Sequence, residues 1–298
     1  MAAPNPIFGI LLLILSSWSL SGLDASGKWI MGAGASLVLL CWVRYTVHLG
    51  LILMITLPSK GPSILRIRYP GLQMLRGTVA LVGTFTFFTA LHYLPQAEAT
   101  AINFLSPLLM LAVAPWVLNE PMRISRWVAA ATGFAGVLII IRPSSGLDMV
   151  GVAWGLTTAC LFAVQHIVTR KLALDDAFST LIWGGITGSV LSSILVPFHW
   201  QEISSILSGF DLTQWLILLS TGFWGGLGHL LQIQAYQRAP ASMLAPFLYL
   251  QIVSAATLGW LVWGHFPDAL TWLGISIICC SGIVIGIIEW RRQASVQS

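Results

Sequence analysis

Long apolar segments recur along almost the whole of this chain. About 20 apolar residues in a helix cross the hydrocarbon core of a bilayer, which is roughly 30 Å thick. Lipid admits only helices or closed barrels, and these segments lack the polar-apolar alternation typical of barrel strands. The sequence therefore predicts an all-α integral membrane protein. Six stretches contain no Asp, Glu, Lys or Arg: residues 99–119, 149–169, 177–201, 212–237, 239–264 and 269–288.

The composition excludes several classes of protein. Only 8% of the residues are charged and 57% are hydrophobic, which leaves too few charges for the surface of a soluble domain. The net charge of +4 comes from cations beside the ends of the apolar segments, so we expect no nucleic-acid partner. Cys41, Cys160, Cys279 and Cys280 all fall within apolar segments, and we expect neither disulfides nor a metal site.

Ten predicted membrane spans account for most of the chain. With the N-terminus in the cytoplasm, only Lys28 and Arg142 lie on the opposite side, Arg44 lies within a span, and the other Lys and Arg residues fall in cytoplasmic loops. This positive-inside pattern favours an even number of spans and predicts that both termini are cytoplasmic. We place the spans at residues 7–23, 33–56, 72–92, 97–118, 125–142, 150–170, 178–199, 213–235, 241–263 and 269–289.

The two halves of the chain resemble each other at an offset of about 145 residues. Residues 92–97 open the fourth predicted span and residues 236–241 open the ninth, and a glycine-bearing span follows each. A unit of five spans enters the membrane from opposite sides in its two copies, as in many secondary transporters. We therefore predict two inverted five-helix repeats, residues 1–145 and 146–298, with a substrate site between them.

Ionisable residues within spans are candidates for function because they are costly in lipid. Arg44 lies inside the second span, with His48 one turn later. It either binds an anion or carboxylate in a central cavity, or is a structural arginine that bonds backbone carbonyls or reaches the interface. Each of His166 and His229 is a core histidine, a ligand contact or a proton carrier.

Three further ionisable residues lie near predicted span ends. Glu98 is favoured as a cap at the start of the fourth span, with proton coupling as the alternative. Asp24 and Lys28 have the spacing of a local ion pair at the end of the first span. Deep aromatic side chains can stack an apolar or aromatic solute. The predicted substrate-binding residues are Trp18, Arg44, Phe85, Phe88, Asn103, His166, His229 and Tyr249.

Motifs that the chain lacks also narrow the function. No Walker loop is present, so we expect no direct use of ATP. The HExxH and GxSxG patterns of enzymes and a filter-like repeat of channels are missing. We expect no catalytic residue and no cofactor, and transport coupled to protons or other ions, or facilitated diffusion. An integral-membrane enzyme and a non-transporting scaffold stay as alternatives of another class.

Several motifs carry a family resemblance that covers nearly the whole chain. In the first half they include Arg76–Gly77, residues 97–101 and Ser106–Pro107, and in the second half Gly228–His229, residues 247–251 and Pro267–Asp268. In this order they closely resemble the two EamA domains of the drug/metabolite transporter superfamily. The resemblance implies ten helices in two inverted repeats around a cavity that opens alternately to each side.

The same resemblance implies small-molecule transport, and with it we expect a secondary transporter in a bacterial inner membrane. Members of the family move amino acids, other metabolites, vitamins or drugs. We favour export of an aromatic or neutral amino acid, and the alternative is import of a vitamin or nucleoside-like compound such as riboflavin or S-adenosylmethionine. One position departs from the family: His265 stands where the second repeat often carries Glu. The motifs indicate neither the direction of transport, nor the coupling ion, nor the oligomeric state.

Overall fold

The computed structural model describes residues 6–118, 123–142, 145–172, 174–239, 244 and 247–297, and all regular secondary structure in these ranges is helical. Eight helical segments in them are long and apolar enough to cross a membrane, and Ile124–Ile140 and Leu250–Trp263 are shorter apolar helices. The predicted all-α fold of ten membrane helices is therefore confirmed. The start of the ninth predicted span lies partly outside the described residues.

The first five spans are built from six α-helices and one short 3-10 helix. Their bounds are α1 Pro6–Gly32, α2 Leu37–Lys60, η1 Pro62–Leu65, α3 Pro70–Tyr93, α4 Gln96–Asn103, α5 Leu105–Val117 and α6 Ile124–Ile140. Helices α4 and α5 together form the fourth span. Helix α1 extends well past residue 23, where we predicted its end, so Asp24 and Lys28 lie inside the helix rather than at its edge.

The second half repeats this order with one addition. Its elements are α7 Met149–Lys171, α8 Ala177–Leu195, η3 Val196–His199, α9 Trp200–Gly209, α10 Leu212–Tyr236, α12 Leu250–Trp263 and α13 Ala269–Gln297. We did not predict helix α9, which fills the connection between the seventh and eighth spans.

The fourth span is interrupted where Pro107 removes a hydrogen bond. A proline at this position has no N–H for the carbonyl of Asn103, four residues earlier, and its ring clashes with that carbonyl. Helix α4 accordingly ends at Asn103, and α5 begins after Phe104. Tyr249, which is 145 residues after Phe104, likewise interrupts a helical stretch immediately before α12. The two aromatic rings contact each other with centroids 5.2 Å apart.

Aspartates cap most helices of the second half. Asp148, Asp176 and Asp211 accept backbone N–H bonds at the starts of α7, α8 and α10. Asp268 does the same before α13, where the Thr271 N–H donates to it at 2.8 Å. A carboxylate at this position satisfies an otherwise unpaired donor and interacts favourably with the helix dipole. These caps explain why four acidic residues of an apolar chain stand directly before spans.

We expect Asp268→Asn to flatten the acid dependence of the melting temperature. The Thr271 N–H, with a smaller effect from Arg142, holds the pKa of Asp268 below its ordinary value of 3.8. Because the folded pKa is depressed, its stabilisation is present above the unfolded pKa and is lost as the pH falls through the folded one. Melting curves between pH 3 and 7 test this. Glu202→Gln, on exposed α9, is the control, and identical acid profiles for Asp268→Asn and the native protein would contradict the expectation.

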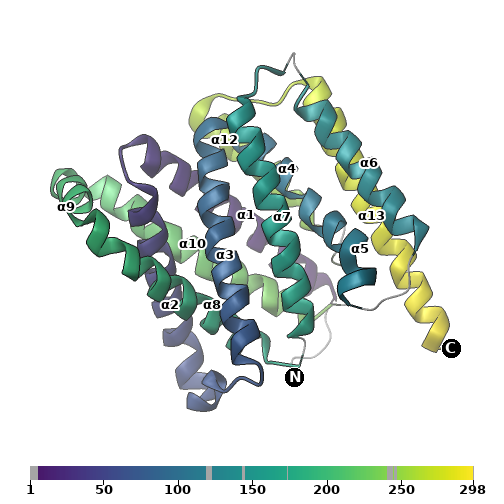
Figure 1. Cartoon of the computed structure of the whole chain (residues 1–298), viewed down its shortest axis with the longest axis horizontal. Helices are drawn as coiled ribbons and strands as arrows, with labels where there is room; N and C mark the ends of the chain where they lie inside the picture. The colour runs from purple at the N-terminus through teal and green to yellow at the C-terminus, as the bar shows by residue number, and fades with distance from the viewer. Residues whose placement is uncertain are drawn as a thin grey trace.

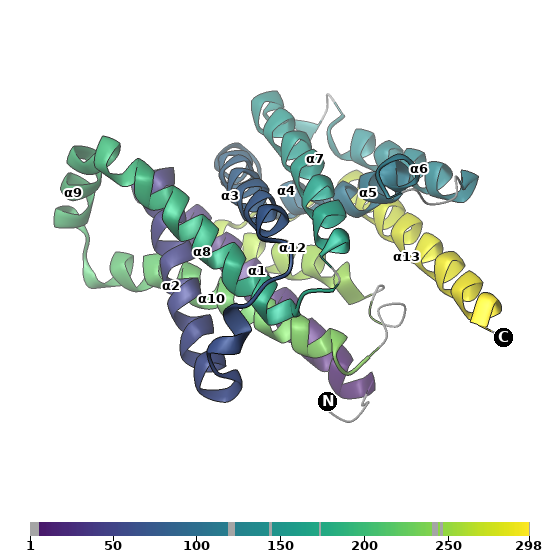
Figure 2. The same cartoon turned by 60° about the horizontal axis from the view of Figure 1, so that its bottom comes forward.

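Helices α6 and α13 lie side by side at one edge of the molecule, while α2, α8 and α9 lie at the opposite edge (Figures 1 and 2). The packing repeats when the two halves are exchanged. Helix α1 packs on α10 as α7 packs on α3, and α2 packs on α10 as α8 packs on α3. Two further pairs, α2 with α8 and α6 with α13, join equivalent helices, and α4 of the fourth span packs on α12 of the ninth. This pattern is that of two five-helix repeats, and the boundary at residues 145 and 146 stays a prediction.

The backbones of α6 and α13 approach most closely at two glycines. A Cβ on Gly136 would lie 2.8 Å from the carbonyl oxygen of Gly274, and a Cβ on Gly274 would lie 2.6 Å from that of Gly136. Neither oxygen can move without moving its helix. The pair therefore sets the distance between these two helices, as small residues do in many membrane bundles.

Candidate functional site

Arg44 projects from the middle of α2 toward α3. Its Nη1 donates to the Thr84 hydroxyl at 2.9 Å, and its guanidinium lies 5.6 Å from the centre of the Phe88 ring. Thr84 also lies 3.0 Å from the Tyr45 hydroxyl and donates to the Ala80 carbonyl. Among the described residues no backbone carbonyl accepts a hydrogen bond from this guanidinium, which does not agree with the reading of Arg44 as a carbonyl-bonded structural arginine. Most of its donors have no partner within the described part of the chain.

Two histidines from facing helices stand beside Arg44. The rings of His48 on α2 and His229 on α10 meet edge to face, with centroids 5.9 Å apart. Gly225, one turn before His229, leaves space here, because a Cβ on it would lie 3.9 Å from both Arg44 Nε and His48 Nδ1. Helices α2, α3 and α10 therefore converge on one polar site within an apolar bundle.

Asp24 faces the same site from α1, and our prediction for it is wrong. It makes no ion pair with Lys28 within the described residues, although the two are one turn apart. Lys28 instead donates its Nζ to the Leu94 carbonyl at the end of α3 and lies 5.3 Å from the centre of the Trp263 ring. The Asp24 side chain is 6% exposed and interacts electrostatically with Arg44. Tertiary packing at both residues outweighs a local pair.

The predicted aromatic residues divide between the site and its surroundings. Phe88 is buried beneath Arg44, and its ring also packs against Gly27 of α1. Phe85 packs on the cluster of Cys41, Tyr45 and Leu81. Trp18 is 43% exposed, and no ring or cation contact within the described residues links it to Arg44.

The other predicted residues lie in two further places. His166 on α7 has exposed surface and interacts electrostatically with Arg76 of α3. Asn103 ends α4, and its buried Oδ1 has no partner within the described residues. Tyr249 contacts Phe104 at the paired helix interruptions. The structure thus brings Arg44, Phe88 and His229 together and leaves the remaining five outside this group.

Polar contacts join the two halves at both ends of the bundle. At the end where α2 finishes, Lys60 pairs with Asp176 at 3.3 Å, and Gln73 Nε2 donates to Asp175 at 2.9 Å. At the opposite end, Glu98 lies 3.0 Å from His265 Nε2. Arg142 pairs with Asp268 at that end too. Glu98 therefore contacts the second half in addition to standing in the first turn of α4, and its buried Oε2 has no partner among the described atoms.

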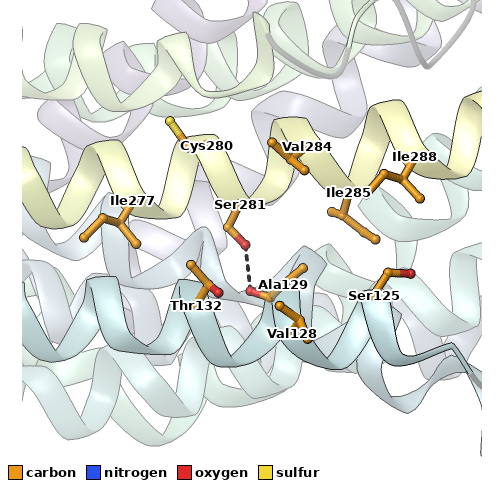
Figure 3. Close-up of a pocket in the computed structure, with 10 residues that line it drawn as sticks. All are labelled: Ser125, Val128, Ala129, Thr132, Ile277, Cys280, Ser281, Val284, Ile285 and Ile288. Atoms are coloured by element: carbon orange, nitrogen blue, oxygen red, sulfur yellow. Dashed lines mark hydrogen bonds between the residues drawn. The ribbon is translucent and has the colours of Figure 1, made fainter.

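A separate groove of about 420 Å³ lies between α6 and α13 (Figure 3). Aliphatic side chains line most of it, including Val128, Val284 and Ile288. Ser281 turns its hydroxyl to the Ala129 carbonyl at 2.6 Å, so it offers no free donor to a ligand. Because none of the described residues that line this groove is charged, we place the candidate solute site at Arg44 and not here.

A family model for EamA-like transporters matches residues 7–142 and 149–287. The chain belongs to the EamA-like transporter family. The two matched segments correspond to the two five-helix halves of the fold. The family resemblance of the motifs is therefore confirmed, and this EamA-like chain is grouped with transporters of small molecules and not with enzymes.

Curated relatives of this EamA-like protein transport different solutes. It is 27% identical over 219 residues to an S-adenosylmethionine uptake transporter of Rickettsia felis, covering 73% of this chain and 72% of that one. It is 28% identical to a riboflavin transporter of Vibrio cholerae, with 85% and 83% covered. It is 26% identical to the pseudopaline exporter CntI of Pseudomonas aeruginosa, with 91% and 94% covered. The names include both uptake and export.

A solved crystal structure has the same fold as this EamA-like chain. The two superpose with a TM-score of 0.63 at 19% sequence identity, covering 96% of this chain and 97% of the other. At this identity the match concerns the arrangement of the helices only.

The predicted substrate-binding residues omitted three members of the polar site, Asp24, His48 and Thr84. His48 was noted in the sequence as one turn after Arg44, and Asp24 has a signal because it is the acidic residue directly after the first predicted span, residues 7–23. Thr84 has none, since threonines within spans commonly bond their own backbone, and Thr84 also does so. The contact between Glu98 and His265 joins two residues that the sequence singled out separately, 167 positions apart.

Proposed function

We propose that this EamA-like protein is a secondary transporter that moves a small carboxylate-bearing metabolite across the membrane by alternating access. The observation that carries the proposal is Arg44. A guanidinium in the middle of a span is costly unless it meets protein or solute, and within the described residues this one donates a single hydrogen bond, to Thr84. Its planar fork suits a carboxylate, which accepts two parallel hydrogen bonds.

The contacts at the two ends support alternating access. The set with Lys60 and Asp176 holds the halves together at one end, and the set with Glu98 and His265 does so at the other. Ion pairs and hydrogen bonds between polar side chains are individually weak, so either set can open without loss of the fold. A solute bound at Arg44, between the two sets of contacts, becomes accessible from one side of the membrane when the set on that side opens.

Two versions of the substrate stay within this proposal. The sequence favours export of an aromatic or neutral amino acid. The alternative is uptake of a nucleoside-like compound, by analogy with the S-adenosylmethionine uptake transporter of Rickettsia felis. Amino acids and S-adenosylmethionine carry a carboxylate, whereas riboflavin does not. Arg44 therefore favours the first two solutes over riboflavin. We further propose a bacterial inner-membrane location with both termini in the cytoplasm, as the basic loops indicate.

The test is flux in sealed, ATP-free proteoliposomes that contain the purified chain. The panel is phenylalanine, methionine, S-adenosylmethionine and riboflavin, each measured inward and outward, with and without a pH gradient. We expect flux of at least one carboxylate-bearing member above that of protein-free liposomes. Flux of riboflavin alone would overturn the carboxylate assignment. A strict requirement for ATP hydrolysis, or no flux of any member, would overturn the proposal of secondary transport.

A further inference from the structure

The buried carboxylate of Asp24 has no hydrogen-bond or ion-pair partner among the residues that the structure describes. Among the acidic side chains that the structure describes, four aspartates cap helices and Glu98 contacts His265. Asp24 differs from these. It is 6% exposed, and no hydrogen bond or ion pair joins it to any described residue. Burial of an unpaired carboxylate is expensive, so such a group is retained where a ligand completes it.

Arg44 interacts electrostatically with Asp24. Within the described residues, no nitrogen of Arg44 comes within 4.0 Å of a carboxylate oxygen, so the two side chains form no ion pair. The site therefore holds a positive and a negative group that are not bonded to each other. A ligand with both charges satisfies both groups, whereas a ligand with one charge leaves the other group unpaired.

We propose that Asp24 and Arg44 are the two charged anchors of the solute site, and that they bind the zwitterionic head of an α-amino acid or amino-acid derivative. Asp24 accepts hydrogen bonds from the ammonium group, and Arg44 donates to the carboxylate. This inference rests on the proposed function, to which it adds the substrate class and the role of Asp24.

The surrounding side chains support one continuous site. The Phe88 ring lies under Arg44 and against Gly27, which stands one turn after Asp24 on α1. On the other side, Gly225 of α10 faces Leu23 of α1 and Arg44 Nε of α2, with 3.5 and 3.9 Å from a Cβ placed on it. Both anchors thus border the junction of α1, α2, α3 and α10.

A metal cation is a poorer match for Asp24 than an ammonium group. No group of three His, Cys, Asp or Glu side chains that could hold a metal ion occurs within the described residues. A bare cation would also be repelled by Arg44 and would bring no anionic group to pair with that guanidinium. A zwitterion brings its own counter-charge and adds no net charge to the site.

The experiment measures affinity for solutes that differ only in charge. The zwitterionic probes are L-phenylalanine, L-methionine and S-adenosylmethionine. The matched probes are 3-phenylpropionate, which lacks the ammonium group, and 2-phenylethylamine, which lacks the carboxylate. Each is titrated into the purified full chain and into the variants Asp24→Asn, Asp24→Glu and Arg44→Gln. Glu202→Gln, on exposed α9, is the control.

We expect the Asp24 and Arg44 variants to lose affinity for different probes. Asp24→Asn should weaken zwitterion binding by roughly tenfold to a hundredfold and leave 3-phenylpropionate unchanged or tighter. Arg44→Gln should weaken the zwitterions and 3-phenylpropionate but not 2-phenylethylamine. Asp24→Glu, which keeps the charge, should recover part of the zwitterion affinity. Melting temperatures close to that of the native protein show that the variants are folded.

Three outcomes would overturn the inference. The first is an equal loss for all probes in Asp24→Asn, which indicates a structural role. The second is no loss for any probe in that variant. The third is a native protein that binds none of the zwitterions. In each case, flux of a carboxylate-bearing solute in proteoliposomes would leave the proposed transport function standing, whereas absence of all flux would remove it.

Discussion

Arg44→Gln should weaken binding of a carboxylate-bearing solute by roughly tenfold to a hundredfold, while the melting temperature stays within a few degrees of the native value. Hydrogen bonds to charged groups contribute about 1.5–3 kcal/mol each, and that range corresponds to this loss of affinity. The fold should tolerate the change because Thr84, the one side chain bonded to Arg44, keeps its contacts with Tyr45 and the Ala80 carbonyl. Titration and melting curves on the same purified variant give both numbers.

Two companion variants sharpen this expectation. Arg44→Lys should recover little affinity, since an ammonium lacks the planar fork that pairs with a carboxylate. Arg238→Gln is the matched control, because Arg238 lies in the turn after α10 and bonds Gln234 in the last turn of that helix. A stable Arg44→Gln protein with unchanged affinity would show that Arg44 does not bind solute. A large drop in melting temperature would assign it a structural role instead.

Gly136→Ala and Gly274→Ala should each lower the stability of the folded chain by about 1–3 kcal/mol, the usual range for an overpacked contact. Each added methyl group would lie less than 3 Å from a carbonyl oxygen of the facing helix, which cannot rotate away. The helices α6 and α13 must then separate along their length. Thermal or denaturant unfolding of the purified variants measures the change.

Gly50→Ala provides the control for helix propensity. Gly50 lies within α2, and a Cβ on it would meet nothing within 4 Å. Alanine is better in a helix than glycine by roughly 0.5–1 kcal/mol, so this variant should be as stable as the native chain or more so. If Gly136→Ala behaves like Gly50→Ala, the close contact between α6 and α13 does not exist. The double variant Gly136→Ala with Gly274→Ala should lose less than the sum, because the first separation relieves the second clash.

The fold was predictable because lipid leaves few alternatives. Hydropathy indicates the number of membrane spans, and the orientation that the distribution of Lys and Arg predicts for them stays a prediction. The end of α1 was not predictable in this way. Asp24 and Lys28 look like the edge of the membrane in the sequence, and only the packing of α3, α10 and α12 around them keeps the helix going to Gly32.

The site was predictable only in part, for a related reason. An ionisable residue within an apolar span is recognisable in the sequence, which is why Arg44 and His229 could be selected. In a helix that is apolar on all sides, the sequence does not indicate which residues face the site. Trp18, Phe85 and Phe88 were therefore all predicted as site residues, although of these three only Phe88 lies under Arg44. Asp24 was discounted because a partner one turn away offered a local explanation.

The contact between Phe104 and Tyr249 has a mechanical consequence. Each ring lies where its span lacks continuous helical hydrogen bonding. The helical segments before and after it can therefore change their relative angle most easily at that point. Because the two rings are in contact, neither the fourth nor the ninth span can bend at its ring without displacing the other. The motions of the two hinges are therefore coupled. When the fourth span tilts in one half, the ninth span must tilt in the other, and this single movement changes access to the site on both sides of the membrane.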